Sequence, residues 1–299
     1  MNTKKTVLIL IGVVLVAFGI GALALNFGNN PQVSIDPNDE WNIGKFFSKN
    51  IGANNGLKEN IDEEKTENID GIKNINVSAP IARVNIISED REDISIHYYG
   101  EIPPSLNTSL DTKKLRDKLD IQISISNRPK INNNNLKLYL DILVPNSYNE
   151  NLKVNADLGD IRLENLELYQ LNIQADLGNV KMDNIKANKM DIDCDLGNII
   201  GNNIRGNANV NADLGNIELD YADFDYDLIA VSNLGSISIT IPKNSNFNLD
   251  AKSDLGTVKT DFPVTSNEVS KTRLKGTVGN GGKDVKLNVD LGSIKVNTK

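Results

Sequence analysis

The chain has 299 residues, of which 39% are apolar and 24% are charged, which is the composition of a folded protein rather than a disordered one. Its net charge of −8 argues against a nucleic-acid partner and against attraction to anionic lipid surfaces. Aromatic residues, at 5%, are too few to form stacking platforms for bases.

Residues 1–29 carry the features of a membrane anchor. Lys4 and Lys5 precede residues 7–25, which are apolar apart from three glycines. As a helix this run spans about 28 Å, close to the ~30 Å hydrocarbon core of a bilayer. The lysines place the N-terminus in the cytoplasm and the rest of the chain outside. A cleaved signal peptide, with Ala22 and Ala24 at the cleavage site, is the alternative, but the apolar run is longer than a usual signal core.

Residues 30–70 are predicted to be a linker, because residues 58–70 are dense in charge and poor in apolar side chains. The solenoid is predicted to occupy residues 71–299, with divergent coils in 71–150 and regular coils in 151–299. Residues 77–86 align with residues 154–163 at every inward position, so 72–88 are predicted to form a divergent first coil. Further strands are expected at 93–99, 119–126 and 136–144, and residues 112–118 are expected to form a solvated loop or helical turn.

A signature of Asp or Asn, Leu and Gly recurs along the regular part. Seven copies are present, and the steps between them are 19, 19, 18, 20, 21 and 36 residues. The signature positions are Asp157 and Gly159, Asp176 and Gly178, Asp195 and Gly197, Asp213 and Gly215, Asn233 and Gly235, Asp254 and Gly256, and Asp290 and Gly292. A period near 20 residues is typical of a stacked repeat protein.

Each copy is predicted to form two strands around a corner. Apolar or small residues stand one, three and five positions before the Asp, and again four and six positions after it, so the inward parity changes at the Gly. Gly accepts backbone angles that other residues resist, which favours a corner there. We therefore predict an all-β fold, a single-stranded parallel β-solenoid (β-helix-like) with coils of about 19 residues, preceded by one transmembrane helix. Residues 276–282, with four glycines, predict a hairpin within the 36-residue step.

The recurring Asp allows two interpretations. Carboxylates stacked about 4.8 Å apart would repel one another by roughly 0.9 kcal/mol per pair in water, and a bound calcium ion would relieve this. Alternatively, each Asp accepts a hydrogen bond from the corner backbone that follows it. Asn233 favours the second interpretation, since a neutral amide makes that bond but weakens a metal column. We therefore predict no metal site, with calcium as the alternative.

The sequence predicts no catalytic or cofactor-binding residues. Cys194, the single cysteine, stands where other copies have Ala, Ser or Val, which suits a small buried side chain. His97, the single histidine, lies in a predicted strand with no nucleophile signature nearby. The chain also lacks a phosphate-binding Gly loop and a dinucleotide fingerprint.

The anchor, the divergent opening and the Asp-Leu-Gly coils resemble the bacterial putative-adhesin family of unknown function, whose LiaG-like members belong to envelope-stress gene clusters in Gram-positive bacteria. The resemblance covers roughly residues 70–299 and implies the architecture without any catalytic residues. We expect a non-enzymatic, membrane-anchored, extracytoplasmic protein, adhesin-like or envelope-stress-associated, that binds a cell-wall polymer or an envelope protein. The alternatives are a secreted carbohydrate-active β-helix enzyme and a calcium-stabilised structural spacer.

Overall fold

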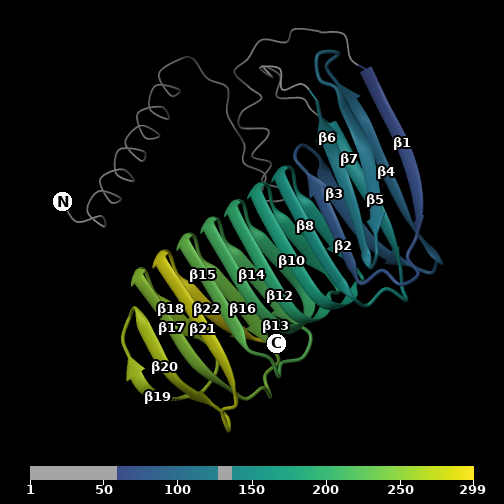
Figure 1. The fold of residues 1–299 in the computed structure, drawn as a ribbon. Helices are drawn as coiled ribbons and strands as arrows, with labels where there is room; N and C mark the ends of the chain where they lie inside the picture. Colours follow the sequence, from purple (N-terminus) through teal and green to yellow (C-terminus); the bar gives the residue numbers. More distant parts are fainter. Residues whose placement is uncertain (1–58, 127–136) are drawn as a thin grey trace, which may run out of the picture. The chain divides into compact units, whose positions relative to one another are not determined.

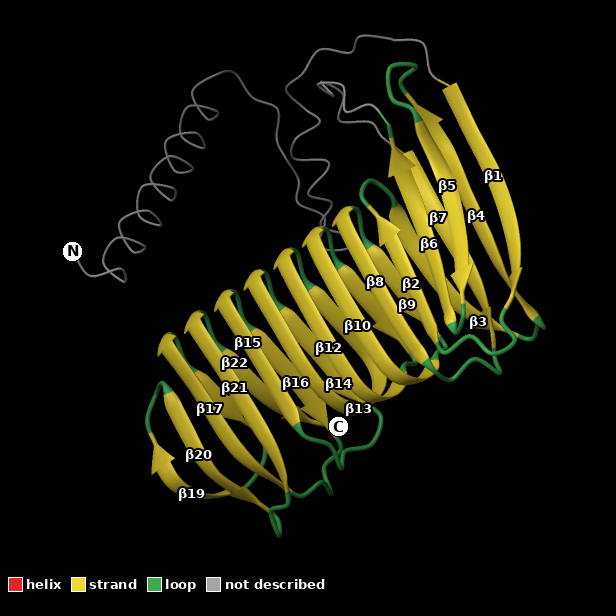
Figure 2. Cartoon of the chain, viewed as in Figure 1, coloured by secondary structure: helices red, strands yellow, loops and turns green. Residues whose placement is uncertain are grey.

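The computed structural model describes residues 59–126 and 137–299, and all regular structure in these ranges is β-strand. No helix in this part of the chain is long and apolar enough to cross a membrane. The anchor predicted at residues 7–25 lies outside the described residues. Figures 1 and 2 show two layers of strands that enclose one hydrophobic core.

The strands form two facing sheets, named here sheet A and sheet B. In spatial order, sheet A contains β1 (Glu59–Asn68), β4 (Asp93–Ile102), β7 (Lys137–Pro145), β3 (Arg83–Glu89), β9 (Ile161–Glu164), β11 (Val180–Asp183), the first part of β13 (Ile199–Leu214), β14 (Ile217–Tyr221), β16 (Ile237–Ile241), β22 (Ile294–Thr298) and β18 (Val258–Thr260). Sheet B contains β5 (Thr108–Leu115), β6 (Lys118–Ile125), β2 (Asn74–Ala79), β8 (Asn151–Leu158), β10 (Glu167–Leu177), β12 (Lys186–Leu196), the second part of β13, β15 (Leu228–Leu234), β21 (Lys283–Leu291), β17 (Phe247–Leu255), β20 (Arg273–Val278) and β19 (Val264–Val269). Because β13 runs through both sheets, all 22 strands belong to one hydrogen-bonded system.

Each regular coil gives one strand to sheet B, turns at the signature Gly, and gives the next strand to sheet A. The side chains that the sequence places inward are buried on both sides of the corner, as with Val154 and Ala156 before it and Ile161 and Leu163 after it. Successive coils pair in parallel and in register, so equivalent side chains form columns. The core is therefore a set of aliphatic columns that run along the stack, and the expectation of an all-β repeat is confirmed.

The corner glycines are required chiefly by how closely the coils approach. Five of the seven have a φ between +144° and +158°, and all seven point the missing Cβ at a carbonyl oxygen of the adjacent coil. A Cβ on Gly178 would lie 2.1 Å from the oxygen of Gly159, and one on Gly215, which has no left-handed φ, would lie 1.8 Å from the oxygen of Gly197. Backbone angle alone therefore does not explain the recurring Gly.

The last coil of the chain does not lie last in the stack. β21 pairs in parallel with β15 on one side and with β17 on the other, while β22 lies between β16 and β18. In Figure 1 the yellow C-terminal strands accordingly lie between greener ones. The β-solenoid predicted from the sequence would stack its coils in chain order, and that part of the prediction is wrong here. A terminal coil between two neighbours forms hydrogen bonds on both sides, and this protects the chain end from fraying.

The coils also depart from chain order at the N-terminal end of the stack. β2 and β3 lie between β8 and β9 on one side and β6 and β7 on the other, although β6 and β7 follow them in the chain. Residues 72–88 pair with the next regular coil in the aligned register, with Val77 opposite Val154 and Val84 opposite Ile161. They are thus an internal coil rather than the first layer.

Antiparallel strands flank the parallel stack at both ends and account for three further corrections. Residues 59–68, predicted as part of the linker, form strand β1. The strand alternates exposed and half-buried positions and pairs with β4 along its whole length. Residues 112–118 are not a loop, since β5 and β6 form a hairpin across them. The hairpin predicted at 276–282 is also absent: β19 and β20 form the hairpin instead, while β20 and β21 lie on opposite sides of β17.

Candidate functional site

The Leu of every signature forms a continuous stripe along one edge of the stack, named here the corner edge. Cross-strand pairing places these leucines next to one another in the order Leu158, Leu177, Leu196, Leu214, Leu234, Leu291 and Leu255. Ten large hydrophobic side chains are exposed in the described ranges, and six of them are these corner leucines. Their exposure runs from 37% for Leu196 to 60% for Leu255, so the stripe is open to a partner.

A column of carboxylates runs beside the leucines, one residue earlier in each coil. Its members, the corner carboxylates, are all exposed: Asp157, Asp176, Asp195, Asp213, Asp290 and Asp254, with Asn233 standing between Asp213 and Asp290. Within the described ranges no cation forms an ion pair with Asp157, Asp176, Asp195 or Asp290, whereas Lys252 lies 2.6 Å from Asp254. The repulsion expected along this column is thus largely unrelieved by the protein itself.

The hydrogen bond predicted for these carboxylates is made by a different residue. In five of the seven coils, the backbone N–H of the residue after the Gly donates to the side chain of the equivalent residue in the neighbouring coil. The contacts run from Asn179 to Asp160 (2.9 Å), Asn198 to Asn179 (3.0 Å), Asn216 to Asn198 (2.9 Å), Ser236 to Asn216 (2.8 Å) and Ser293 to Ser236 (3.3 Å), and the Thr257 hydroxyl lies 3.0 Å from that of Ser293. This corner ladder holds the corners in line without using the side chains of Asp157, Asp176, Asp195 and Asp290.

Arg83 ends the corner ladder at the N-terminal side. It stands in the divergent coil at the position equivalent to Asp160, and its guanidinium lies 3.1 Å from that carboxylate. The same guanidinium carbon lies 5.8 Å from the centre of the Tyr139 ring, a cation–π distance. The ladder's single terminal charge is therefore neutralised within the fold.

The residue just before the Asp also bonds across the coils where it can. The Ser232 hydroxyl donates to the carbonyl of Gly215 (3.1 Å), and Ser253 does the same to Gly292 (2.8 Å). The Cys194 thiol donates to the carbonyl of Gly178 (3.4 Å). Burial, together with the nearby charges of Asp195 and Asp213, raises the pKa of Cys194 to about 11. The thiol is thus neutral and engaged in packing, which opposes a nucleophilic role.

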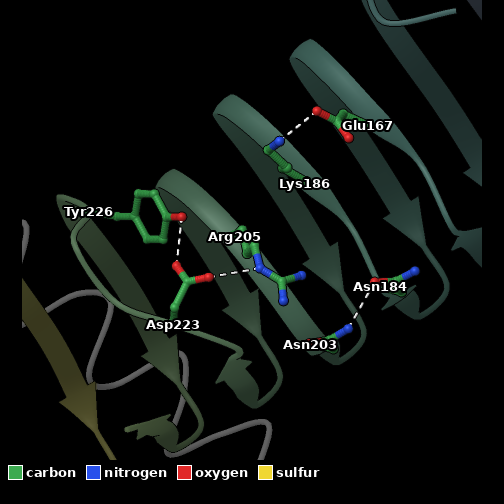
Figure 3. Close-up of polar contacts among 7 residues, drawn as sticks. All are labelled: Glu167, Asn184, Lys186, Asn203, Arg205, Asp223 and Tyr226. Atoms are coloured by element: carbon green, nitrogen blue, oxygen red, sulfur yellow. Dashed lines mark hydrogen bonds and ion pairs between the residues drawn. The ribbon is translucent and has the colours of Figure 1, made fainter. Parts of the chain in front are cut away.

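The opposite edge, where each coil returns to sheet B, has a different chemistry (Figure 3). There, charged side chains pair with the next coil: Lys186 lies 2.5 Å from Glu167, and Arg205 lies 2.8 Å from Asp223. The amide of Asn203 bonds to that of Asn184 at 2.8 Å, and both residues have a positive φ in the return turn. Unlike Asp157, Asp176 and Asp195, the acidic groups at these contacts are already neutralised by a cation of the fold.

Two hollows lie on the surface of the described residues. One, of about 630 Å³, lies between β1 and the segment before β5, and its walls include Glu59, Ile61 and Leu106. The other, of about 310 Å³, lies on the return-turn edge beside the exposed Tyr169. Neither contains Cys194 or His97. His97 instead contacts Asp62 at 2.7 Å and stacks on Tyr99, with ring centroids 4.3 Å apart. In the described ranges no three His, Cys, Asp or Glu side chains are arranged to hold a metal ion.

The structure thus brings all the predicted corner residues together on one edge, in columns. The corner ladder and the exposed leucines are the features that sequence reasoning missed. The corner ladder had a signal, because the position after the Gly is always Asp, Asn, Ser or Thr. The Leu continues the inward alternation of the strand before it, which hides its exposure, and falls outside the inward parity only of the strand after it.

A comparison with known protein families matches the Toastrack DUF4097 family twice, at residues 72–199 and 149–297. The chain belongs to that family. The resemblance drawn from the Asp-Leu-Gly coils is therefore confirmed, and the two matches together span the stack described above. No curated protein sequence matches the chain.

Several solved structures are similar to this member of the Toastrack DUF4097 family at low sequence identity. One is a putative cell adhesion protein from Clostridium sporogenes, with 15% identity over 81% of this chain and 100% of that one, at a TM-score of 0.41. A putative adhesin from Bacteroides fragilis has 14% identity over 81% and 97% of the two chains, at a TM-score of 0.43. A putative lipid binding protein from Parabacteroides distasonis has 15% identity over 82% and 98%, at a TM-score of 0.25.

Proposed function

We propose that this protein is a non-enzymatic, membrane-anchored, extracytoplasmic binding protein of adhesin type that engages an envelope partner through its corner edge. The observation that carries the proposal is the stripe of exposed leucines beside the carboxylates of Asp157, Asp176 and Asp195, with which no described cation forms an ion pair. Soluble proteins seldom expose contiguous apolar surface without using it for an interaction. Here the exposure recurs in coil after coil at one position, so it is a property of the whole edge.

The stripe lies outside the buried core. The corner is fixed by the Gly, by the corner ladder and by the buried residues on both sides, none of which involves the Leu side chain. A polar residue at 37–60% exposure would hydrate more favourably than Leu. Retaining Leu in every copy therefore suits a surface that becomes buried in a complex.

The non-enzymatic assignment is supported by the state of the reactive side chains. Cys194 is buried with a raised pKa, and His97 lies against a carboxylate and an aromatic ring rather than beside a nucleophile. The anchor at residues 7–25 and the outward location are supported by the sequence of residues 1–29. Digestion of intact cells by added protease tests the location: loss of residues 59–299 is expected, and their full protection would contradict it.

A capture assay tests the binding surface. The full-length chain, immobilised in non-ionic detergent, is incubated with purified cell wall and with solubilised envelope proteins from the source bacterium. Replacing Leu177, Leu196 and Leu214 by Gln is expected to abolish capture of the partner that the wild type retains, because the apolar contact is lost.

The matched control replaces three exposed apolar side chains elsewhere, Leu115, Ile229 and Val269, by Gln. It removes comparable hydrophobic surface and should leave capture unchanged. Equal capture by the wild type and the corner variant, with both variants folded by circular dichroism, would overturn the proposal.

A further inference from the structure

We infer that the occupant of the corner edge is a cationic amphipathic α-helix of a partner protein, laid along the stack with its apolar face on the leucines and its basic flank on the carboxylates. The inference rests on the proposed function, since it names the class of partner that the same edge binds. The charge of the corner edge, the spacing of its leucines and the width of the leucine stripe each favour this occupant.

The charge of the edge selects a cationic partner. Asp157, Asp176 and Asp195 follow one another in adjacent coils, at the spacing of about 4.8 Å that separates paired strands. No described cation pairs with them, so positive side chains from outside would relieve their repulsion. A second copy of this chain would bring its own carboxylate column against the first, and an anionic lipid surface would be repelled. Both are therefore disfavoured as occupants.

The repeat distance selects a helix. Successive leucines follow the coil spacing of about 4.8 Å, and successive turns of an α-helix are about 5.4 Å apart. The difference reaches about 2.4 Å, half a coil spacing, only after four intervals, so a helix stays in register across five successive corners. Side chains on one face of an extended strand recur about every 6.7 Å, so a strand laid along the edge would lose register after two coils.

The width of the stripe suits a single helix. One Leu per coil gives a line of apolar side chains, and a helix presents a comparable line through residues at i, i+3, i+4 and i+7. Two globular proteins in a stable complex bury about 800 Å² on each side, more than a single line of half-exposed leucines supplies. Seven coils span about 29 Å, which a helix of about 19 residues covers.

The probe is a synthetic 20-residue peptide with Leu on one helical face and Lys on the rest, labelled with a fluorophore. Its binding is measured by anisotropy against the full-length chain in nanodiscs of zwitterionic lipid, with empty nanodiscs as the baseline. A peptide of the same composition in scrambled order, which has no apolar face, is the control ligand. We expect the amphipathic peptide to bind, to gain helical circular dichroism on binding, and to weaken at least tenfold between 50 and 500 mM NaCl.

Two protein variants separate the apolar and the charged contributions. Leu177, Leu196 and Leu214 are replaced by Gln in one, and Asp157, Asp176 and Asp195 by Asn in the other; Asn233 already occupies that column and donates to Asp213 at 2.8 Å. Each is expected to weaken binding at least tenfold. The control variant neutralises Glu218, Asp225 and Asp261, which are exposed carboxylates outside the corner edge, and should stay within twofold of wild type.

The outcomes distinguish this inference from the proposed function. If the peptide binds the wild type and both corner variants equally, or if the scrambled peptide binds as well, the helix assignment is wrong. If light scattering instead shows a dimer that the Leu variant abolishes, the occupant is a second copy. If the peptide fails to bind while the Leu variant still loses its envelope partner, only the helix is refuted. If that variant also keeps its envelope partner, the proposed function fails as well.

Discussion

The backbone N–H of Gly235 donates to the carbonyl of Leu291 at 3.1 Å, so two corners 57 residues apart in the chain are direct neighbours in the stack. The N–H of Gly292 in turn donates to Leu255 at 3.0 Å. The coil that ends the chain is therefore held on both sides by backbone hydrogen bonds. As a result, the leucine stripe continues through the C-terminal coil, and Asp290 and Asp254 extend the carboxylate column beyond Asn233.

Gly178→Ala should destabilise the fold more than Gly282→Ala. Both glycines have a φ that disfavours a side chain, +152° and +126°, which costs about 1–3 kcal/mol. A Cβ at residue 178 would also lie 2.1 Å from the oxygen of Gly159, whereas one at residue 282 has nothing within 4 Å. We expect Gly178→Ala to lose a further ~2 kcal/mol of the free energy of unfolding, the cost of overpacking, since the two coils must separate to admit the Cβ. Urea denaturation measures the loss of stability in both variants. Equal losses would mean that adjacent corners are not in contact.

Asn198→Ala should cost about 1–2 kcal/mol of folding free energy, because the N–H of Asn216 loses its acceptor, now 2.9 Å away. Asn198→Ser should cost clearly less, since Ser236 accepts the equivalent bond from Ser293 in the same column. Chemical denaturation of the two variants tests the corner ladder. If Asn198→Ser lowers the stability as much as Asn198→Ala, the side-chain oxygen is not the acceptor.

The sequence predicted the local structure of each regular coil because that structure depends on nearby residues. Val154, Ile161 and their counterparts are buried as the alternation indicates, and the change of parity marks the corner. Residues 72–88 could be aligned although Pro80 and Ala82 replace the Asp and the Gly of the signature, because their inward side chains follow the same pattern. The family resemblance depended on the same motif.

The order of the coils could not be predicted in this way. Coils with the same inward pattern can stack in any order, so nothing in residues 283–298 shows that they enter between two earlier coils. Strand β1 was missed because its charges suit an edge strand as well as a linker; Glu63 accepts a hydrogen bond from the N–H of Leu110 at 3.0 Å. The exposed stripe was missed because the repeated Leu was assigned to the motif rather than to the surface.

Cys194 should make the fold sensitive to alkaline pH. Because burial raises the pKa of the folded thiol to about 11, above its unfolded value near 9, its stabilising contribution is complete below pH 9 and is lost as the pH rises toward 11. Cys194→Ala removes this contribution, and Ala175 and Ala212 already occupy the equivalent position. The stability difference between wild type and variant, measured by denaturation at pH 8, 9.5 and 11, should move in favour of the variant. A difference independent of pH would contradict the burial of the thiol.

The continuity of the corner columns is tested most directly by engineered disulfides in a Cys194→Ala background. Ser236→Cys with Ser293→Cys places two thiols in adjacent coils, where the N–H of Ser293 now lies 3.3 Å from the Ser236 hydroxyl. Ser236→Cys with Thr257→Cys places them two coils apart, about 9.6 Å, which is beyond the reach of a disulfide. Mild oxidation of the folded protein, followed by mass spectrometry, should give an intramolecular disulfide in the first pair and free thiols in the second. A disulfide between residues 236 and 257, with none between 236 and 293, would show that the coils stack in chain order and that the corner edge described here does not exist.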